Sequence, residues 1–256
     1  MMKSIAERHI YILEQLKKQQ YIKVTEIAKE LDVTTVTIRK DLKALEERNL
    51  LFRTHGSATP INPHVPDISV QIKGKIRNEE KGKIAIEAAK LIEENDSIIV
   101  SSGSTIYKFA EQIKPISHLN VVTPSLPVAI LLNEVDNISI IQLGGNLCKK
   151  SLSVRGEYAV QAFSDFTCSK LFMGVDGIDK EQGITNSNIE EALLSKKMIE
   201  ASSKTIILAD SSKFGKRGFG KICTLENIDI VITDEGITDS MANILDDFGI
   251  KLIIAT

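Results

Sequence analysis

A stretch near the amino end of the chain carries side chains that could bind nucleic acid. In residues 34–47 (TTVTIRKDLKALEE), Ile38, Leu42 and Leu45 recur at helical spacing and predict one buried face. A rotation of about 100° per residue puts two lysines on the opposite face, with hydroxyl and guanidinium groups at its amino end. The side chains through which this helix could contact DNA are Thr35, Thr37, Arg39, Lys40 and Lys43. Such a face can read base edges and phosphates in a major groove.

Two further cation-capable side chains follow in residues 50–56 (LLFRTHG), which have strand character and end in glycine. Strand alternation puts Arg53 and His55 on one face. A wing carrying this pair could grip a phosphate or the minor groove. A run such as residues 37–40 (TIRK), taken alone, is more typical of an ordinary solvated helix surface. The strand and glycine that follow favour the DNA-binding interpretation.

Two more helices are expected to position this reading helix. The apolar positions of the first helix are Ile5, Ile10, Ile12, Leu13 and Leu16. Thr25 is a suitable N-cap for the second helix, and Asp32-Val33 forms the turn that follows it. Thr34 or Thr35 then starts the third helix. The order of helix, turn, helix and strand predicts a winged helix-turn-helix.

The same residues resemble the DeoR family of bacterial transcriptional regulators. The resemblance rests on Arg8 with Ile12-Leu13, on residues 33–42 (VTTVTIRKDL) and on residues 51–56 (LFRTHG). Three positions depart from the usual family pattern of Ser, Arg and Gly: Thr34, Lys40 and Ser57. The resemblance implies operator DNA as a partner and an amino-terminal winged helix-turn-helix domain, which we expect to occupy residues 1–57.

The next segment is expected to be a hinge. Residues 57–67 (SATPINPHVPD) hold three of the six prolines of the chain and little periodic hydrophobicity. A charged helical stretch, roughly residues 68–94, follows it. We therefore expect residues 58–80 to form the linker and the start of a connecting helix, and residues 81–256 to form a second domain.

Short β-branched runs alternate with helical patterns in that second domain. The predicted strands are 98–100, 121–122, 138–141, 171–175, 206–208, 230–233 and 252–254. The predicted helices between them include 105–113, 126–134, 188–202 and 238–247. This alternation predicts an α/β domain with a mainly parallel sheet.

Small polar residues, glycines and one lysine follow the predicted strands. The candidate ligand-binding residues are Ser102, Gly103, Ser104, Thr105, Thr123, Ser125, Gly144, Gly145, Asp176 and Lys213. In open α/β sheets the carboxyl ends of the strands form the ligand crevice. Hydroxyls, backbone N–H groups and an ammonium there would suit an anion. Taken singly, the Gly-Ser-Thr turn could be a helix cap, the glycine pair a turn and Lys213 a solvated lysine. Five such loops at one edge of the sheet nevertheless favour a binding site.

The family resemblance extends through this region and covers nearly the whole chain. It rests on residues 102–105 (SGST), 122–125 (VTPS), 144–145 (GG), 183–185 (GIT) and 208–214 (LADSSKF). It implies an effector domain related in fold to ribose-5-phosphate isomerase that senses a phosphorylated sugar. The site implied by the resemblance includes Ser104, Thr105, Thr123, Ser125, the glycine pair and Lys213. Pro124 stands where the family more often has Asn.

Three functions are weighed. The first is a repressor whose operator affinity is set by a phosphosugar. The second is a sugar-phosphate isomerase carrying a DNA-binding appendage, because Asp176-Gly177-x-Asp179 resembles the paired carboxylates that assist proton transfer. Residues 186–196 (NSNIEEALLSK) lack the glycine-rich lysine segment expected there, so we expect no catalysis. The third is a constitutive DNA-binding scaffold.

Further expectations concern charge, cysteines, cofactors, membranes and assembly. Net charge is −2, but residues 1–60 hold 11 Lys and Arg against 8 Asp and Glu, while the remainder holds 21 against 26. The basic excess suits DNA contact by the first domain only. Cys148, Cys168 and Cys223 form no CxxC pair, which favours reduced thiols in the cytoplasm and no metal site. We expect no cofactor and no membrane span, and a homo-oligomer, because one winged module reads only a short half-site.

Overall fold

The chain divides between His64 and Val65 into two units, each with its own hydrophobic core. The computed structural model describes residues 4–19, 21–48, 50–54, 56–59, 64–115 and 117–256. None of the helices in these ranges is long and apolar enough to span a membrane.

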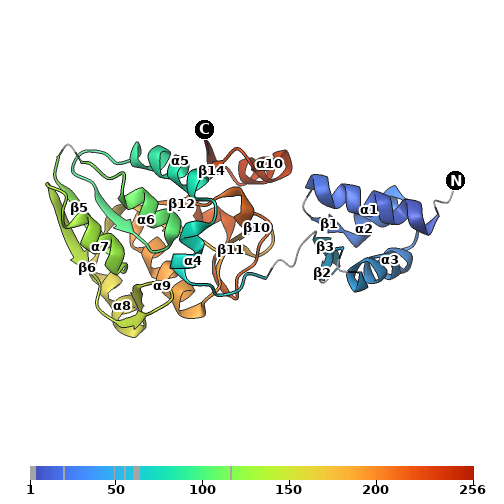
Figure 1. The fold of residues 1–256 in the computed structure, drawn as a ribbon, viewed down its shortest axis with the longest axis horizontal. Coiled ribbons are helices and arrows are strands. Elements are labelled where there is room, and N and C mark those ends of the chain that lie inside the picture. Colours follow the sequence, from blue (N-terminus) through green and yellow to red (C-terminus); the bar gives the residue numbers. More distant parts are fainter. Residues whose placement is uncertain (1–3, 20, 49, 55, 60–63, 116) are drawn as a thin grey trace. The chain divides into compact units, whose positions relative to one another are not determined.

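The first unit is a winged helix-turn-helix, as expected (Figure 1). Its elements are α1 (Ile5–Gln19), β1 (Ile22–Lys23), α2 (Val24–Glu30), α3 (Thr35–Glu47), β2 (Phe52–Thr54) and β3 (Ser57–Thr59). The three strands pair antiparallel in the order β1-β3-β2. The buried side chains that join the three helices include Ile12, Leu16, Ile27, Ile38, Leu42 and Leu45. The apolar face predicted for α3 is therefore the face that packs.

Local details of this unit differ from the expectation. Ile5 and Ile10 are exposed, because the buried stripe of α1 runs through Arg8, Ile12 and Leu16 instead. Thr25 is not an N-cap, since α2 begins one residue earlier at Val24. Thr34 does cap α3, because its hydroxyl accepts a hydrogen bond of 3.1 Å from the Thr37 backbone N–H.

A buried ion pair ties α1 to the reading helix. The Arg8 guanidinium donates to both carboxylate oxygens of Asp41, with Nε–Oδ2 at 2.7 Å and Nη2–Oδ1 at 3.0 Å. Both side chains are buried, at 9% and 6% exposure. The bonds from Asp41 raise the pKa of Arg8 against the opposing effect of burial. This bidentate contact therefore joins α1 to α3.

The expected hinge and connecting helix look different in the structure. Residues 57–59 belong to the wing, because β3 pairs with both β1 and β2. The single helical stretch expected at 68–94 is two helices, α4 (Val70–Lys75) and α5 (Asn78–Ala89). The break lies at Arg77, whose backbone is left-handed at φ 51°. Contacts made by the Arg77 side chain, described below, hold it in this conformation.

The second unit is built on a seven-stranded sheet in which every neighbouring pair is parallel. Its strands are β4 (Ser97–Val100), β5 (Leu119–Thr123), β6 (Ile138–Gln142), β9 (Cys168–Gly174), β12 (Ser202–Leu208), β14 (Ile230–Asp234) and β15 (Lys251–Ala255). The order across the sheet is β15-β14-β12-β9-β4-β5-β6. All seven predicted strands are present, and the predicted α/β class is confirmed.

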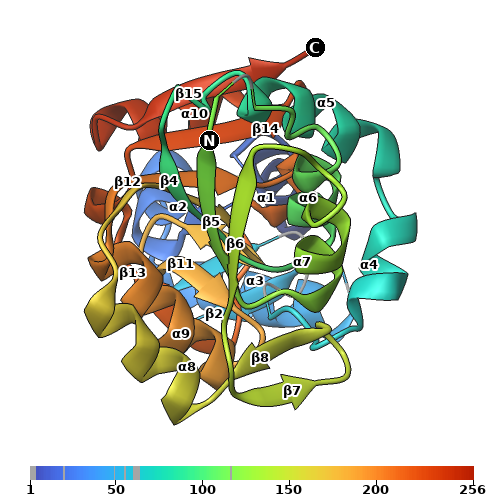
Figure 2. The same ribbon diagram turned by 90° about the vertical axis from the view of Figure 1, so that its left-hand side faces the viewer.

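Helices cover both faces of this sheet, because alternate strand residues point to opposite sides. Ile98, Phe172 and Ile206 belong to the core under α5, α6 (Ser104–Ala110) and α7 (Leu126–Leu132). Ile99 and Ile207 belong to the core under α8 (Glu157–Ala162), α9 (Ile189–Glu200) and α10 (Asp239–Asp247). Figure 2 shows α6 and α7 on one side of β4, β5 and β6, and α8 and α9 on the other.

Two small antiparallel sheets were not predicted. The hairpin of β7 (Asn146–Cys148) and β8 (Ser153–Arg155) follows β6. A three-stranded sheet joins β10 (Gly177–Asp179), β11 (Gly183–Asn186) and β13 (Gly220–Cys223). Short 3₁₀ turns at Phe163–Asp165, Ser211–Lys213 and Leu225–Asn227 complete the unit.

Candidate functional site

The exposed face of α3 presents cations where the sequence predicts them. Arg39, Lys40 and Lys43 are exposed, and Thr35 and Thr37 are partly buried at the amino end. Lys43 approaches Glu47 at 3.9 Å, a distance at which an exposed pair contributes little. Within the described part of the chain, Arg39 and Lys40 have no ion-pair partner, so both are available to a phosphate or a base.

Arg53 of the wing forms an ion pair within the protein, whereas the sequence predicted a side chain that faces DNA. Arg53 on β2 pairs with Glu46 at the carboxyl end of α3, with Nε–Oε2 at 2.6 Å, and its backbone N–H donates to Oε1 at 2.9 Å. The backbone and then the guanidinium of Arg53 lower the pKa of Glu46, which stays ionised. Arg53 would have to share or leave this carboxylate to reach DNA. His55 lies outside the described residues.

A cavity lies where the order of the parallel strands reverses. The chain runs from β4 outward through β5 to β6, and then returns to the other side of β4 with β9. The loops after β4 and β9 therefore diverge at their carboxyl ends and leave a crevice between them, the usual ligand site of open α/β sheets. Residues 101–105 and 174–176 line the cavity from these two loops, and its volume is about 70 Å³.

Six of the ten residues predicted for this site line the cavity. They are Ser102, Gly103, Ser104, Thr105, Asp176 and Lys213. Gly103 has φ 116°, a conformation that side chains rarely adopt, so the tight turn after β4 requires glycine. Lys213 lies in the 3₁₀ turn after β12, which the Asp210 side chain caps by accepting from the Ser212 N–H at 3.1 Å.

The other four predicted residues are not among the described residues that line it. Thr123 is fully buried, and its hydroxyl accepts from the Ser125 N–H at 3.1 Å. Ser125 lies on a neighbouring hollow of about 370 Å³ between α4, α6 and α7. The Gly144-Gly145 pair is a close approach to β8, where a Cβ on Gly145 would lie 2.7 Å from the Arg155 carbonyl oxygen. The β7–β8 hairpin packs against these loops, with Val154 N–H donating to the Pro124 carbonyl at 2.9 Å.

Charges in the cavity are partly neutralised from within the protein. Lys73 on α4 donates to Asp176 Oδ1 at 2.6 Å, and Ser187 donates to Oδ2 from its backbone at 3.0 Å and its hydroxyl at 2.6 Å. Burial raises the pKa of Asp176, but Lys73 and Ser187 outweigh it and hold the pKa below its usual value. Lys213 has no ion-pair partner within the described ranges, which leaves one cation available to an anionic ligand.

The sequence did not predict the residues that close the cavity from three other parts of the sensor unit. They are Asp67, Ile68, Val70 and Lys73 before and on α4, Lys150, Ser151 and Ser153 on the hairpin, and Asn186, Glu191 and Ser195 at β11 and α9. Burial raises the pKa of Glu191 despite a hydrogen bond from Ser151. Among the charged residues of this set, only Lys73 stood in the charged helical stretch that the sequence predicts after the hinge. Nothing in the sequence indicated that Lys73 pairs with Asp176.

Asp179, the second carboxylate of the isomerase-like motif, is not among these lining residues. Its Oδ1 accepts from the backbone N–H groups of Glu181 and Gln182, both at 2.9 Å, and its Oδ2 from Arg217 at 2.9 Å. Its carboxylate is thus occupied in shaping the turn between β10 and β11. The pair of carboxylates proposed for proton transfer is not assembled in the cavity.

Comparison with known families gives matches to both units. Residues 8–64 match the DeoR-like helix-turn-helix domain, and residues 76–235 match the DeoR C terminal sensor domain. The first match spans the reading helix and wing. The second spans α5 and every loop of the parallel sheet that contributes to the cavity.

Relatives match over nearly their whole length. The HTH-type transcriptional regulator YulB of Bacillus subtilis strain 168 is 38% identical, with 97% of this chain and 96% of the relative covered. The HTH-type transcriptional repressor GlcR of the same strain is 34% identical, with 97% and 95% covered. The glycerol-3-phosphate regulon repressor of Escherichia coli K12 is 30% identical, with 96% and 97% covered. Among solved structures, ribose 5 phosphate isomerase A from Neisseria gonorrhoeae is similar over 54% of each chain, with 21% identity and a TM-score of 0.41.

Proposed function

Because the chain belongs to the DeoR family of transcriptional regulators, we propose that it represses genes of carbohydrate metabolism in the cytoplasm and that a phosphorylated sugar controls its affinity for operator DNA. The helix-turn-helix unit supplies DNA binding, and the sensor unit supplies control.

The cavity at the strand-order reversal is the observation that carries the effector part of the proposal. Ser102, Ser104 and Thr105 bring hydroxyls, which suit both a phosphate and sugar hydroxyl groups. Lys213 brings a positive charge that has no ion-pair partner among the described residues, which suits the phosphate. The name of the relative from Escherichia coli, a glycerol-3-phosphate regulon repressor, supports a phosphorylated polyol as the class of ligand.

The DNA-binding part is carried by α3 and the wing. We propose that Thr35, Thr37, Arg39, Lys40 and Lys43 face the major groove and that Arg53 and His55 contact the backbone or minor groove beside it. Arg39 can form a bidentate contact to guanine, whereas Lys40 and Lys43 can neutralise phosphates as point charges. Operator binding should therefore depend on both base sequence and salt concentration.

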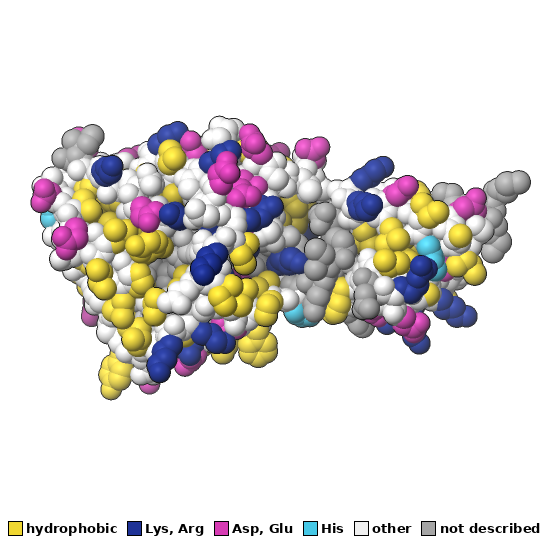
Figure 3. All heavy atoms as spheres, in the orientation of Figure 1, with side chains coloured by type: hydrophobic (Ala, Val, Ile, Leu, Met, Phe, Trp, Pro, Cys, Tyr) yellow, Lys and Arg dark blue, Asp and Glu magenta, His cyan; other side chains and the backbone are white. Residues whose placement is uncertain are grey.

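One winged helix-turn-helix reads only a short half-site. Binding that is specific among the many competing sites of a genome therefore calls for two such units, and so for self-association. The sensor unit offers an apolar surface for it. Hydrophobic side chains gather over α7, β6 and α8 (Figure 3), where Ile130, Ile141 and Tyr158 are exposed at 71%, 46% and 81%. β6 is also an unpaired edge of the described sheet. We propose a homo-oligomer held by this surface.

The alternative of a sugar-phosphate isomerase is not supported. The full-length relatives are named as regulators and repressors, and Asp179 is held in a turn away from Asp176. We propose that the cavity binds its ligand without converting it.

The test compares Lys213→Gln with a matched control, Lys180→Gln, which removes an exposed lysine outside the cavity. Calorimetry with ribose 5-phosphate, glucose 6-phosphate, glycerol 3-phosphate and their unphosphorylated parents measures affinity. Loss of one charge-assisted contact should weaken the phosphorylated ligand by about 10- to 150-fold in Lys213→Gln, and the control should bind as the wild type does. Equal affinity for parents and phosphates, or an unaffected Lys213→Gln, would refute the site.

A further inference from the structure

The chain that leaves the DNA-binding unit passes directly along the wall of the cavity. Residues 65–73 begin at the boundary after His64, and Asp67, Ile68, Val70 and Lys73 line the cavity. Three contacts hold this segment against the sensor unit: the Val65 N–H to the Arg217 carbonyl at 3.0 Å, the Val70 N–H to the Lys150 carbonyl at 2.8 Å, and Lys150 Nζ to Asp67 Oδ2 at 2.8 Å. A ligand in the cavity would therefore touch the segment that connects the two units.

The cavity is narrow while this wall stays in place. Its volume of about 70 Å³ has room for a few water molecules, whereas small-molecule sites begin at roughly 300 Å³. A sugar phosphate that enters would press on this lining or extend into the neighbouring hollow of about 370 Å³, and Val70 of α4 borders both. The loops after β9 and β12 lead into the small sheet of β10, β11 and β13, whereas α4 is a helix of six residues with no buried residue. The helix α4 is the part of the lining that can move.

One ion pair joins α4 to the cavity floor. Lys73 Nζ and Asp176 Oδ1 are 2.6 Å apart, and their side chains are 20% and 8% exposed. An anionic group entering beside Asp176 would compete for the Lys73 ammonium and would be repelled by the carboxylate. Both effects favour transfer of the ammonium from Asp176 to the ligand.

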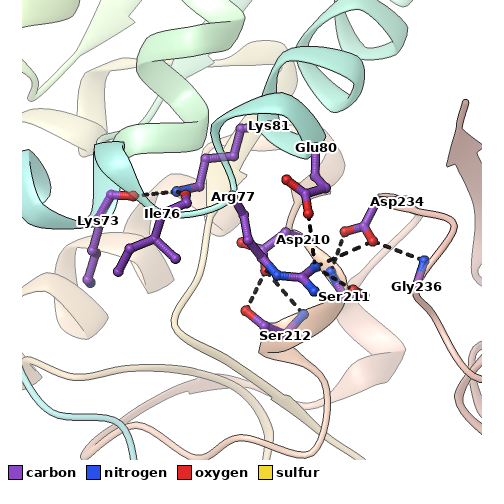
Figure 4. Close-up of polar contacts among 10 residues, drawn as sticks. All are labelled: Lys73, Ile76, Arg77, Glu80, Lys81, Asp210, Ser211, Ser212, Asp234 and Gly236. Carbon is purple, nitrogen blue, oxygen red and sulfur yellow. Dashed lines mark hydrogen bonds and ion pairs between the residues drawn. The ribbon is translucent and has the colours of Figure 1, made fainter.

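The carboxyl end of α4, in contrast, is anchored. Lys81, which is 3% exposed, reaches back from α5 and donates to the carbonyl oxygens of Lys73 at 2.5 Å and Ile76 at 2.6 Å (Figure 4). The Lys73 carbonyl also accepts from the Ile76 backbone N–H at 3.2 Å, so Lys81 adds a second donor at the carboxyl end of α4. The two bonds from Lys81 also fix the joint between α4 and α5.

Arg77 locks the same joint to the loops that follow β12 and β14. Its guanidinium lies 2.8 Å from the Ser211 hydroxyl and 3.5 Å from Asp234 Oδ1, with Asp210 Oδ1 at 3.9 Å (Figure 4). Asp234 in turn accepts from the backbone N–H groups of Ser211 at 2.6 Å and Gly236 at 3.0 Å. Because the Lys73 carbonyl and the Ile76–Arg77 joint are both held, a change in the contacts of the Lys73 side chain can move only the amino end of α4, which continues into residues 65–69.

We propose that Lys73 is a ligand-binding residue and that its ion pair with Asp176 is the latch through which the cavity controls DNA binding. The anionic group of the ligand takes the ammonium from Asp176, the amino end of α4 shifts while Lys81 holds its carboxyl end, and residues 65–69 leave their present contacts. This inference rests on the proposed function, and it adds the path from the ligand to the DNA-binding unit.

The test uses the full chain and four proteins: wild type, Lys73→Gln, Asp176→Asn, and Lys75→Gln as the matched control on the exposed face of the same helix. Operator affinity is measured by fluorescence anisotropy with and without saturating glucose 6-phosphate, ribose 5-phosphate or glycerol 3-phosphate. Calorimetry confirms saturation in each protein. Wild type and Lys75→Gln should show a change of about 5- to 150-fold with the ligand that binds. In saturated Lys73→Gln the change should shrink to less than about twofold.

Asp176→Asn tests the latch without ligand, because it removes the charge that holds Lys73. Its operator affinity should already be shifted in the direction in which the ligand shifts the wild type. A full ligand response in saturated Lys73→Gln, or wild-type operator affinity in Asp176→Asn, would overturn the latch and leave the proposed function intact. Wild-type protein that binds none of the three phosphates would overturn both.

Hydrogen exchange keeps the inference testable if a variant folds poorly. In the wild-type protein, adding the ligand that binds should change exchange in residues 65–75 and leave α5 unchanged, because the joint is fixed. Unchanged exchange in 65–75 at saturation would refute the movement.

Discussion

The ion pair between Arg8 and Asp41 allows a quantitative test of how the reading helix is held. Asp41→Asn keeps the size of the side chain and removes the carboxylate that pairs with the buried Arg8 guanidinium. Removing one partner of a buried pair costs about 3–5 kcal/mol. The pair lies in a unit of only 64 residues, so we expect the lower end, about 3 kcal/mol. At about 0.05–0.15 kcal/mol per residue, that is a third or more of the stability of the unit.

Hydrogen exchange of the α3 amides in the full-length protein measures this loss directly, with the amides of β9 and β12 as an internal reference. A loss of about 3 kcal/mol corresponds to roughly 150-fold faster exchange in α3. The matched control is Asp32→Asn, an exposed turn residue with φ 52°, a conformation that Asn tolerates. It should change stability by less than about 0.5 kcal/mol.

The double variant Arg8→Met, Asp41→Leu separates packing from charge. Replacing both partners by apolar groups should recover most of the loss, because no charge is left buried. A loss below about 1 kcal/mol in Asp41→Asn, or a double variant that is less stable than both single variants, would refute the claim that this pair holds α3 through its charge.

Three further outcomes are expected. Arg39→Ala should weaken operator binding by about 1–3 kcal/mol if Arg39 contacts a base. Lys40→Ala should reduce the slope of log affinity against log salt concentration by about 1, because one phosphate contact is lost. Unchanged operator binding by the double variant in anisotropy titrations would exclude α3 as the helix that reads DNA. Because the pKa of Asp176 is lower in the folded protein than the ordinary value of 3.8, ionised Asp176 stabilises the fold at pH above 3.8. This stabilisation is lost as the pH falls through the lower pKa of the folded state. Urea midpoints of wild type and Asp176→Asn should therefore differ at pH 6 and converge below about pH 3.8, and a constant difference across that range would contradict the assignment. A fragment that begins at Val65 should self-associate in light scattering, and Ile130→Lys should weaken its association; a monomeric fragment would place the oligomer contacts elsewhere.

The elements that the sequence predicted are those determined by local pattern. The β-branched runs became the seven parallel strands because both faces of the sheet are covered and each strand must be apolar throughout. The face of α3 followed from helical spacing alone. The turn at Gly103 was placed correctly, because small polar residues after a strand have a local conformational cause.

The features that the sequence did not predict depend on contacts between distant residues. The break at Arg77 is stabilised by Ser211 and Asp234, more than 130 residues away, and no local pattern announces it. Gly145 was assigned to the ligand, but it serves a close approach to the Arg155 carbonyl. Lys73 was missed for the same reason, since its role is defined by Asp176 and the fold that brings the two together.

The most direct test of the central claim is an operator titration of the full-length protein with and without a phosphorylated sugar and its unphosphorylated parent. We expect sequence-specific binding whose affinity changes by about 5- to 150-fold with the phosphorylated ligand and stays unchanged with the parent. Operator binding that is indifferent to every phosphorylated ligand bound by the sensor unit would contradict the account.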